Sequence, residues 1–105
     1  MDAAPQPRIA VDRDRIAAFC QKWHIVEFSL FGSVLRDDFR PDSDVDVLVV
    51  FDEQAGPPGL DWIDMVEELK EILGRNVDLL TLRSLKNPYR KNEILRSHQV
   101  IYRAA

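Results

Sequence analysis

Two stretches of the chain repeat apolar residues at the spacing of an α-helix. The first, over about residues 12–23, places its apolar residues at i, i+3, i+4 and i+7, which puts them on one face. These residues are Ile16, Phe19, Cys20 and Trp23. The second, over about residues 60–73, carries a similar stripe and is followed by Gly74, which suits a left-handed cap. We expect helices here that pack on a sheet.

Four shorter apolar runs predict strands, because they are rich in Val, Phe, Leu and Ile and are separated by turn or helix signals. They cover about residues 26–31, 45–51, 77–81 and 100–102.

A third helix is expected between the last two strands. Asn87 can act as its N-cap and Pro88 can occupy its first position, although its apolar periodicity is weak. The order of elements predicts an α/β (α+β) fold, in which helices pack on a small mixed β-sheet.

The length of 105 residues favours one domain with a modest core. We expect residues 1–11 to be a flexible N-terminal segment and residues 12–105 to form that domain. The longest unbroken apolar run, residues 47–51, is too short to span a membrane, and residues 1–8 lack the pattern of a secretory signal. Because Cys20 has no partner for an internal disulfide, we expect a cytoplasmic protein.

Charge is distributed unevenly along the chain, whose formal net charge is -4. The last quarter, from about residue 81, is basic, with Glu93 as its single acidic residue. Its basic residues are Arg83, Lys86, Arg90, Lys91, Arg96 and Arg103. Two interpretations are equally open: a solvated helix face, or a surface that meets phosphates or an acidic partner.

Acidic residues interrupt two of the predicted strands. Asp44 and Asp46 stand at the head of the second strand, and residues two apart in a strand point to the same face. Asp78 lies inside the third strand, which could lie beside the second. Paired carboxylates repel each other unless a cation lies between them, and hard oxygen ligands suit Mg²⁺. Two such ions commonly serve nucleotidyl transfer, so we expect a site for two Mg²⁺.

Gly32 and Ser33 follow the first strand and suit the binding of a triphosphate. Glycine lets a backbone approach a phosphate closely, and serine can open a helix whose free amides attract anions. Arg36 lies one turn further on and could reach the outer phosphates. Each feature alone has a simpler explanation, as a turn, a solvated strand end or an outward strand residue. The ordered combination is what favours a nucleotide site.

Residues 29–49, together with residues 74–81, resemble the DNA polymerase beta-like nucleotidyltransferase superfamily. Within it, the chain is similar to the small prokaryotic MNT proteins over nearly its whole length. The resemblance implies that Asp44, Asp46 and Asp78 are catalytic residues that bind the metals, and that Asp78 helps to deprotonate the acceptor. It also implies that Gly32 and Ser33 hold the triphosphate.

MNT proteins are often encoded beside a HEPN-family toxin and act as its antitoxin, and some transfer AMP onto a tyrosine of that toxin. The resemblance therefore implies a Mg²⁺-dependent adenylyltransferase with ATP as substrate and a HEPN-type toxin as partner. One departure is that Asp37 and Asp38 follow Arg36, where many active relatives have glycine. Their charge is expected to weaken nucleotide binding, unless their side chains point away from the nucleotide or pair with Arg40. Two alternatives stay open: an antitoxin that acts only by binding its toxin, and a transferase that acts on RNA through the basic residues.

Overall fold

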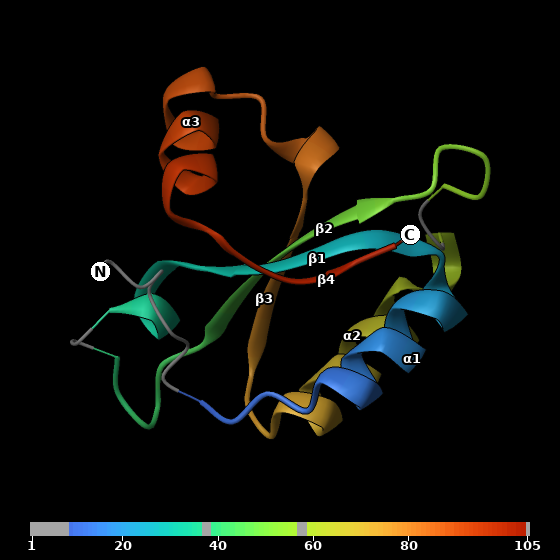
Figure 1. The fold of residues 1–105 in the computed structure, drawn as a ribbon, viewed down its shortest axis with the longest axis horizontal. Coiled ribbons are helices and arrows are strands. Elements are labelled where there is room, and N and C mark those ends of the chain that lie inside the picture. The colour runs from blue at the N-terminus through green and yellow to red at the C-terminus, as the bar shows by residue number, and fades with distance from the viewer. Residues whose placement is uncertain (1–8, 37–38, 57–58, 105) are drawn as a thin grey trace.

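The four strands form one mixed sheet. The computed structural model describes residues 9–36, 39–56 and 59–104 of the chain. Its strands are β1 (Ile25–Phe31), β2 (Val45–Phe51), β3 (Val77–Thr81) and β4 (Gln99–Arg103). Their order in the sheet is β3-β2-β1-β4, with β2 and β3 parallel and the other neighbouring pairs antiparallel (Figure 1). The predicted mixed sheet is confirmed.

Helices cover both faces of this sheet (Figure 1). On one face lie α1 (Arg13–Trp23) and α2 (Trp62–Leu73), and on the other lies α3 (Pro88–Ser97). The expected caps are present, because Asn87 accepts hydrogen bonds from two amides of α3 and Gly74 ends α2 at φ 68°. The predicted start of the second helix was two residues early: residues 59–61 form a tighter 3₁₀ turn, and the α-helix begins at Trp62.

The main hydrophobic core fills the space between the sheet and the pair α1 and α2. Alternate residues of β2, Val45, Val47 and Val49, are fully buried in it, as the period of two in a strand requires. From the helices, Phe19 and Leu69 are buried against this face. Burial of these side chains supplies most of the driving force for folding.

A smaller apolar cluster lies on the opposite face, beneath α3. Its buried residues are Phe31, Leu48, Leu85 and Ile94. Ile94 is the buried residue of α3, so this helix rests on the sheet through a narrow apolar stripe. The even-numbered residues of β2 therefore face α3. Leu48 lies beneath this helix, and Asp46 lies two residues closer to the start of the strand.

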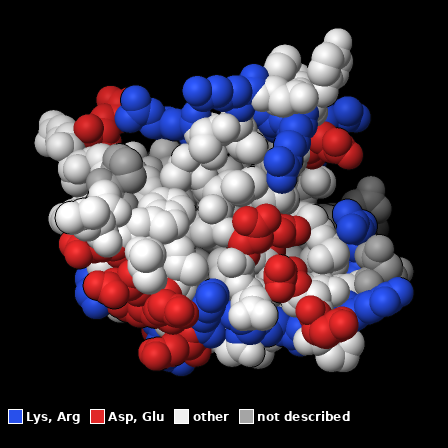
Figure 2. Space-filling view, turned by 180° about the vertical axis from the view of Figure 1, so that it is seen from behind, with Lys and Arg blue, Asp and Glu red and all other residues white. Residues whose placement is uncertain are grey.

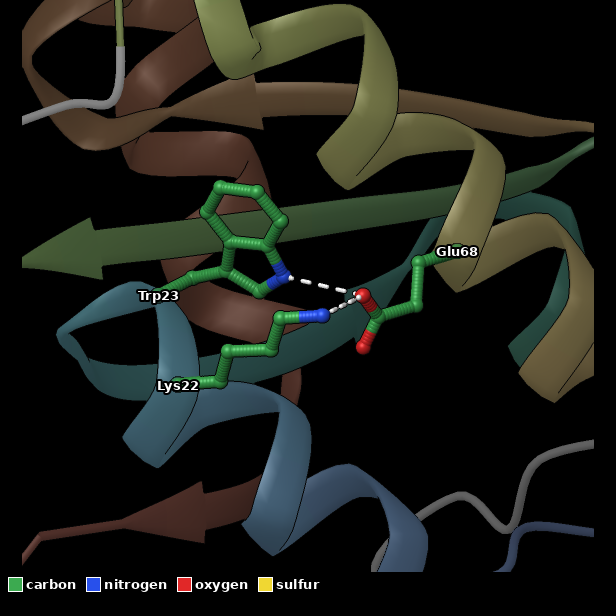
Figure 3. Close-up of polar contacts among 3 residues, drawn as sticks. All are labelled: Lys22, Trp23 and Glu68. Carbon is green, nitrogen blue, oxygen red and sulfur yellow. Dashed lines mark hydrogen bonds and ion pairs between the residues drawn. The ribbon is translucent and has the colours of Figure 1, made fainter.

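A polar contact joins α1 to α2 at the edge of the main core (Figure 3). Glu68 of α2 accepts a hydrogen bond from the ammonium of Lys22 at 2.7 Å and a longer one from the indole N–H of Trp23 at 3.4 Å. The Lys22 ammonium also lies 5.3 Å from the centre of the Trp23 ring. Since Lys22 is largely exposed, the ion pair contributes at most about 1 kcal/mol to stability.

The described part of the chain holds no helix with the length and apolarity that crossing a membrane requires. Most of the predicted N-terminal segment lies outside the described residues. Its last part, however, packs on the protein: Ile9 and Val11 are partly buried against the main core.

Candidate functional site

Parallel pairing of β2 with β3 places two of the three predicted carboxylates side by side. Asp46 and Asp78 are register partners, so their side chains leave the sheet at the same level. They lie on the face that carries α3, because their neighbours Val45, Val47 and Val77 pack into the core on the other face. Asp46 is half-buried and Asp78, on an edge strand, is exposed.

Asp44 completes the acidic group from just before β2. It is exposed, and the next residue enters the strand through a hydrogen bond from the Val45 amide to the carbonyl of Asn76, at 3.0 Å. Burial raises the pKa of Asp46 above its ordinary value of 3.8, and repulsion by Asp78 and Asp44 raises it further. Asp46 is therefore the centre of a group of like charges.

The donor chemistry of this group fits a hard divalent cation. Oxygen ligands from neighbouring strands suit Mg²⁺, and a cation would relieve the repulsion felt by Asp46. In the described residues, however, no three acidic, histidine or cysteine side chains already converge as a metal site. The fold thus brings the carboxylates to one edge of the sheet without forming a complete coordination site.

Gly32 lies directly against the Asp46 carboxylate. Phe31, the register partner of Asp46, ends β1, and Gly32 then turns the chain at φ 76°. A Cβ built on Gly32 would overlap an Asp46 carboxylate oxygen. Both the backbone conformation and the available space therefore require glycine at this position.

The segment after Gly32 differs from the helix that the sequence suggested. It is a four-residue 3₁₀ helix, η1 (Gly32–Leu35), and Ser33 lies within it rather than capping it. Val34 and Leu35 turn into the main core, and Arg36 then resumes an extended backbone, which ends the helix after one turn. So short a helix has little macrodipole, and attraction for a phosphate here must come from local amides and cationic side chains.

Two arginines, one before Asp46 in the sequence and one after it, lie close enough to Asp46 to affect its pKa. Arg36, at the end of η1, and Arg90, on α3, each oppose the rise in the pKa of Asp46. Arg36 was a predicted site residue, whereas Arg90 was assigned only to the basic stretch. The missed signal is helical spacing: Arg90 lies four residues before Ile94, the residue of α3 that packs on the sheet, so both occupy one face of the helix.

Basic side chains are gathered along one edge of this side of the molecule (Figure 2). In Figure 2, Lys and Arg gather along the part of the surface formed by α3, and acidic groups lie below them. Of the basic stretch predicted from the sequence, Arg90 is the residue that opposes the rise in the pKa of Asp46. Asp37 and Asp38, which were expected to weaken nucleotide binding, lie outside the described residues.

A pocket of about 640 Å³ opens beside Asp44, at the end of the sheet where β2 and β3 begin. Asp44 and Asn76 line it on the side of the sheet, and Lys70 and Arg75 line it on the side of α2. The pocket does not include Asp46 or Asp78, so it adjoins the carboxylate group rather than containing it.

Residues 14–101 match the family of the nucleotidyltransferase domain. The chain belongs to this family. The match covers most of the chain and includes every predicted site residue, and it confirms the expected enzyme class.

Individual relatives agree with this assignment. Protein adenylyltransferase MntA of Thermococcus cleftensis is 39% identical over 82 residues, which are 78% of each chain. A solved structure described as a "putative minimal nucleotidyltransferase" is 34% identical, with a TM-score of 0.68 over 83% of this chain and 86% of that one.

A more distant solved structure contains the tri-AMPylated HEPN toxin of Shewanella oneidensis in complex with MNT antitoxin. The matched chain is 18% identical, with a TM-score of 0.62 over 88% of this chain and 70% of that one, and so shares the fold. The predicted fold of the DNA polymerase beta-like nucleotidyltransferases is confirmed.

Gly32→Ala should destabilise the protein by more than the left-handed backbone alone explains. That strain costs about 1–2 kcal/mol at any such position, and at Gly32 the new methyl group must also displace the Asp46 carboxylate. Gly74→Ala is the matched control, because Gly74 has φ 68° and open space around its Cβ position. Urea unfolding of both variants gives the difference between their losses of stability. This difference should shrink when Asp46 is also replaced by alanine. Equal losses for the two glycines would contradict the contact.

Asp46→Asn should raise the midpoint of thermal unfolding at neutral pH without metal. A carboxyl whose pKa is raised by folding stabilises the protein while protonated, below 3.8, and loses that contribution as pH rises through the pKa of the folded state. The asparagine gain should therefore be present at pH 7 and vanish at about pH 3. Asp61→Asn is the control, because it removes an exposed carboxylate next to Trp62, which contacts Phe51 at the opposite end of β2 from Asp46. A large loss of stability in Asp46→Asn would mean that Asp46 has a structural partner.

Proposed function

We propose that this protein is a Mg²⁺-dependent adenylyltransferase that transfers AMP from ATP to a tyrosine hydroxyl of a HEPN-type toxin and thereby acts as its antitoxin. The nucleotidyltransferase class comes from the family. The metal, the nucleotide, the site residues and the acceptor are the proposal.

One observation carries this proposal: Asp46 and Asp78 stand side by side on β2 and β3, with Gly32 against Asp46. A half-buried carboxylate that is repelled by its neighbours and flanked by arginines is a costly arrangement for stability alone. Such perturbed groups cluster at functional sites. The lack of a side chain at Gly32 lets the Asp46 carboxylate lie directly against the backbone.

Asp44, Asp46 and Asp78 would hold Mg²⁺. Bound there, the metal would neutralise charge on the phosphates and on the attacking and leaving oxygens. The acceptor oxygen attacks the α-phosphorus of ATP, the bond from that phosphorus to the bridging oxygen breaks, and pyrophosphate leaves. Asp78 is suited to take the hydroxyl proton, since it is exposed on an edge strand that an incoming acceptor can reach.

The phosphates would lie between η1 and α3. The backbone of Gly32 and Ser33 can approach them, and Arg36 and Arg90 carry cationic side chains close enough to influence Asp46. The N-terminus of α3 is not the anion site, because the Asn87 side chain already accepts hydrogen bonds from its amides of Tyr89 and Arg90.

The relatives support a HEPN-type toxin as the acceptor protein and support the antitoxin role. The relative at 39% identity is named a protein adenylyltransferase, and the complex that shares this fold contains an AMPylated HEPN toxin. Two rivals remain for experiment to decide. An antitoxin that acts only by binding would need the toxin-facing surface but not the carboxylates, and a transferase acting on RNA would use the basic face of α3.

The double variant Asp44→Ala with Asp46→Ala should abolish transfer of label from α-labelled ATP to the toxin, while binding of the toxin persists. The reason is that Asp78 alone cannot hold the metals that stabilise the transition state. The loss should exceed about a thousandfold, since electrostatic stabilisation of this kind is commonly the largest catalytic contribution. Asp61→Ala with Asp64→Ala removes the same charge from exposed positions at the start of α2 and should transfer label normally.

Protection of cells separates the two antitoxin mechanisms. If transfer neutralises the toxin, the double aspartate variant fails to protect at native expression. Full protection by that variant, with no label transferred by the wild type, would mean that the protein neutralises its toxin by binding alone. Label on RNA instead of on the toxin would favour the RNA transferase.

Arg90→Met should weaken binding of ATP with Mg²⁺ about tenfold and binding of AMP much less, if Arg90 contacts the outer phosphates. One lost charge-assisted hydrogen bond of about 1.5–3 kcal/mol accounts for this change. Arg96→Met is the control, because Arg96 is an exposed arginine of the same helix. Calorimetry with each nucleotide gives the two affinities. An equal loss for ATP and AMP would place Arg90 away from the outer phosphates.

A further inference from the structure

The loop that delivers Asp44 has few regular contacts of its own. Residues 39–44 form neither helix nor strand, and β2 begins only at Val45. Within the loop, the Ser43 amide donates to the Arg40 carbonyl at 3.0 Å, and the Ser43 hydroxyl accepts from the Arg40 amide at 3.1 Å. These bonds shape a local turn, but they do not fix that turn relative to the sheet.

The side chain of Arg75, which lies between α2 and β3, connects this turn to the rest of the fold. Its Nη1 donates to the carbonyl of Pro41 at 2.8 Å and to that of Arg40 at 3.3 Å. Its guanidinium also lies 4.8 Å from the centre of the Phe39 ring, and Phe39 packs against the main core. One half-buried arginine thus holds three successive residues of the loop.

Arg75 is itself placed by the elements around it. Gly74 caps α2 through a hydrogen bond from its amide to the Lys70 carbonyl, and the Asn76 carbonyl accepts from the Val45 amide. Two residues after Asn76, the chain reaches Asp78. The same short segment therefore sets the start of β3, the start of β2 and the position of the loop before Asp44.

We propose that Arg75 is a positioning residue, which holds residues 39–43 so that Asp44 stands beside Asp46 and Asp78 and can share a metal with them. The metal part of this inference rests on the proposed function, whereas the restraint on the loop does not. A restraint is needed because three like charges repel, and the loop is the part of the group that strand pairing leaves free. Arginine suits the task, since its planar fork can donate to two carbonyls while its face stacks on a ring.

The test compares Arg75→Ala and Arg75→Lys with Arg13→Ala. Arg13 is a matched control, because its Nη1 also donates to a backbone carbonyl, that of Ile101 at 3.1 Å, but far from the carboxylates. Two quantities are measured: hydrogen exchange of the Ser43 and Val45 amides without metal, and affinity for Mn²⁺ by calorimetry. Thermal unfolding shows that each variant is folded, and Phe39→Leu gives a second, milder way to loosen the loop.

In Arg75→Ala we expect the Ser43 amide to exchange at least about tenfold faster and Mn²⁺ affinity to fall about tenfold, which corresponds to about 1.4 kcal/mol. Arg75→Lys should recover part of both, Phe39→Leu should show smaller shifts in the same direction, and Arg13→Ala should change neither. Faster exchange with unchanged Mn²⁺ affinity would make Arg75 merely structural and overturn the inference, as would unchanged exchange. If the wild type binds no Mn²⁺, the proposed function fails, and the metal-positioning role fails with it.

Discussion

Parallel pairing between β2 and β3 is the constraint on which the candidate site depends. It sets Asp46 opposite Asp78 through main-chain hydrogen bonds, which neither carboxylate can disturb by turning its own side chain. A parallel pair needs a crossover, and α2 supplies it while burying Met65 and Leu69 against the sheet. The helix that completes the core is therefore also what brings the two acidic residues together.

The strand β2 serves two opposed requirements at once. Its odd-numbered valines are buried in the main core and favour folding, while Asp46 on the even-numbered side bears a charge that its neighbours repel. Because side chains alternate in a strand, the two sets do not compete for the same space. Burial of the valines keeps β2 in place, and the strand in turn holds Asp46 at its position. The domain can therefore tolerate the electrostatic cost of this carboxylate.

Local patterns in the sequence were enough for much of this arrangement. The apolar run from Val45 predicted β2, and the glycine after α2 and the Asn-Pro pair before α3 predicted the end of α2 and the start of α3. Each of these signals acts over a few residues. The closeness of Asp78 to Asp46 followed from expecting their strands to be neighbours. The single 3₁₀ turn after Gly32 was missed because burial of Val34 and Leu35, a tertiary effect, decides where that turn ends.

The contributions of Arg75 and Arg90 were also missed in the sequence, for a related reason. Each acts on residues more than thirty positions away in the chain, Arg75 on the loop before Asp44 and Arg90 on Asp46. Nothing in the residues next to them marks such contacts. The apolar Ile94 within a polar helix was a usable hint for Arg90, whereas Arg75 follows a helix cap and offers no periodicity at all.

The small apolar contact between α3 and the sheet has a consequence for how the molecule moves. This helix is attached through the small cluster around Ile94, whereas α1 and α2 share the main core. Segments with little buried apolar surface open at a lower free energy than the rest of a protein. We therefore expect α3, which carries Arg90, to open from the sheet at a lower free energy than α1 or α2, so that Asp46 can become more exposed while the sheet stays folded.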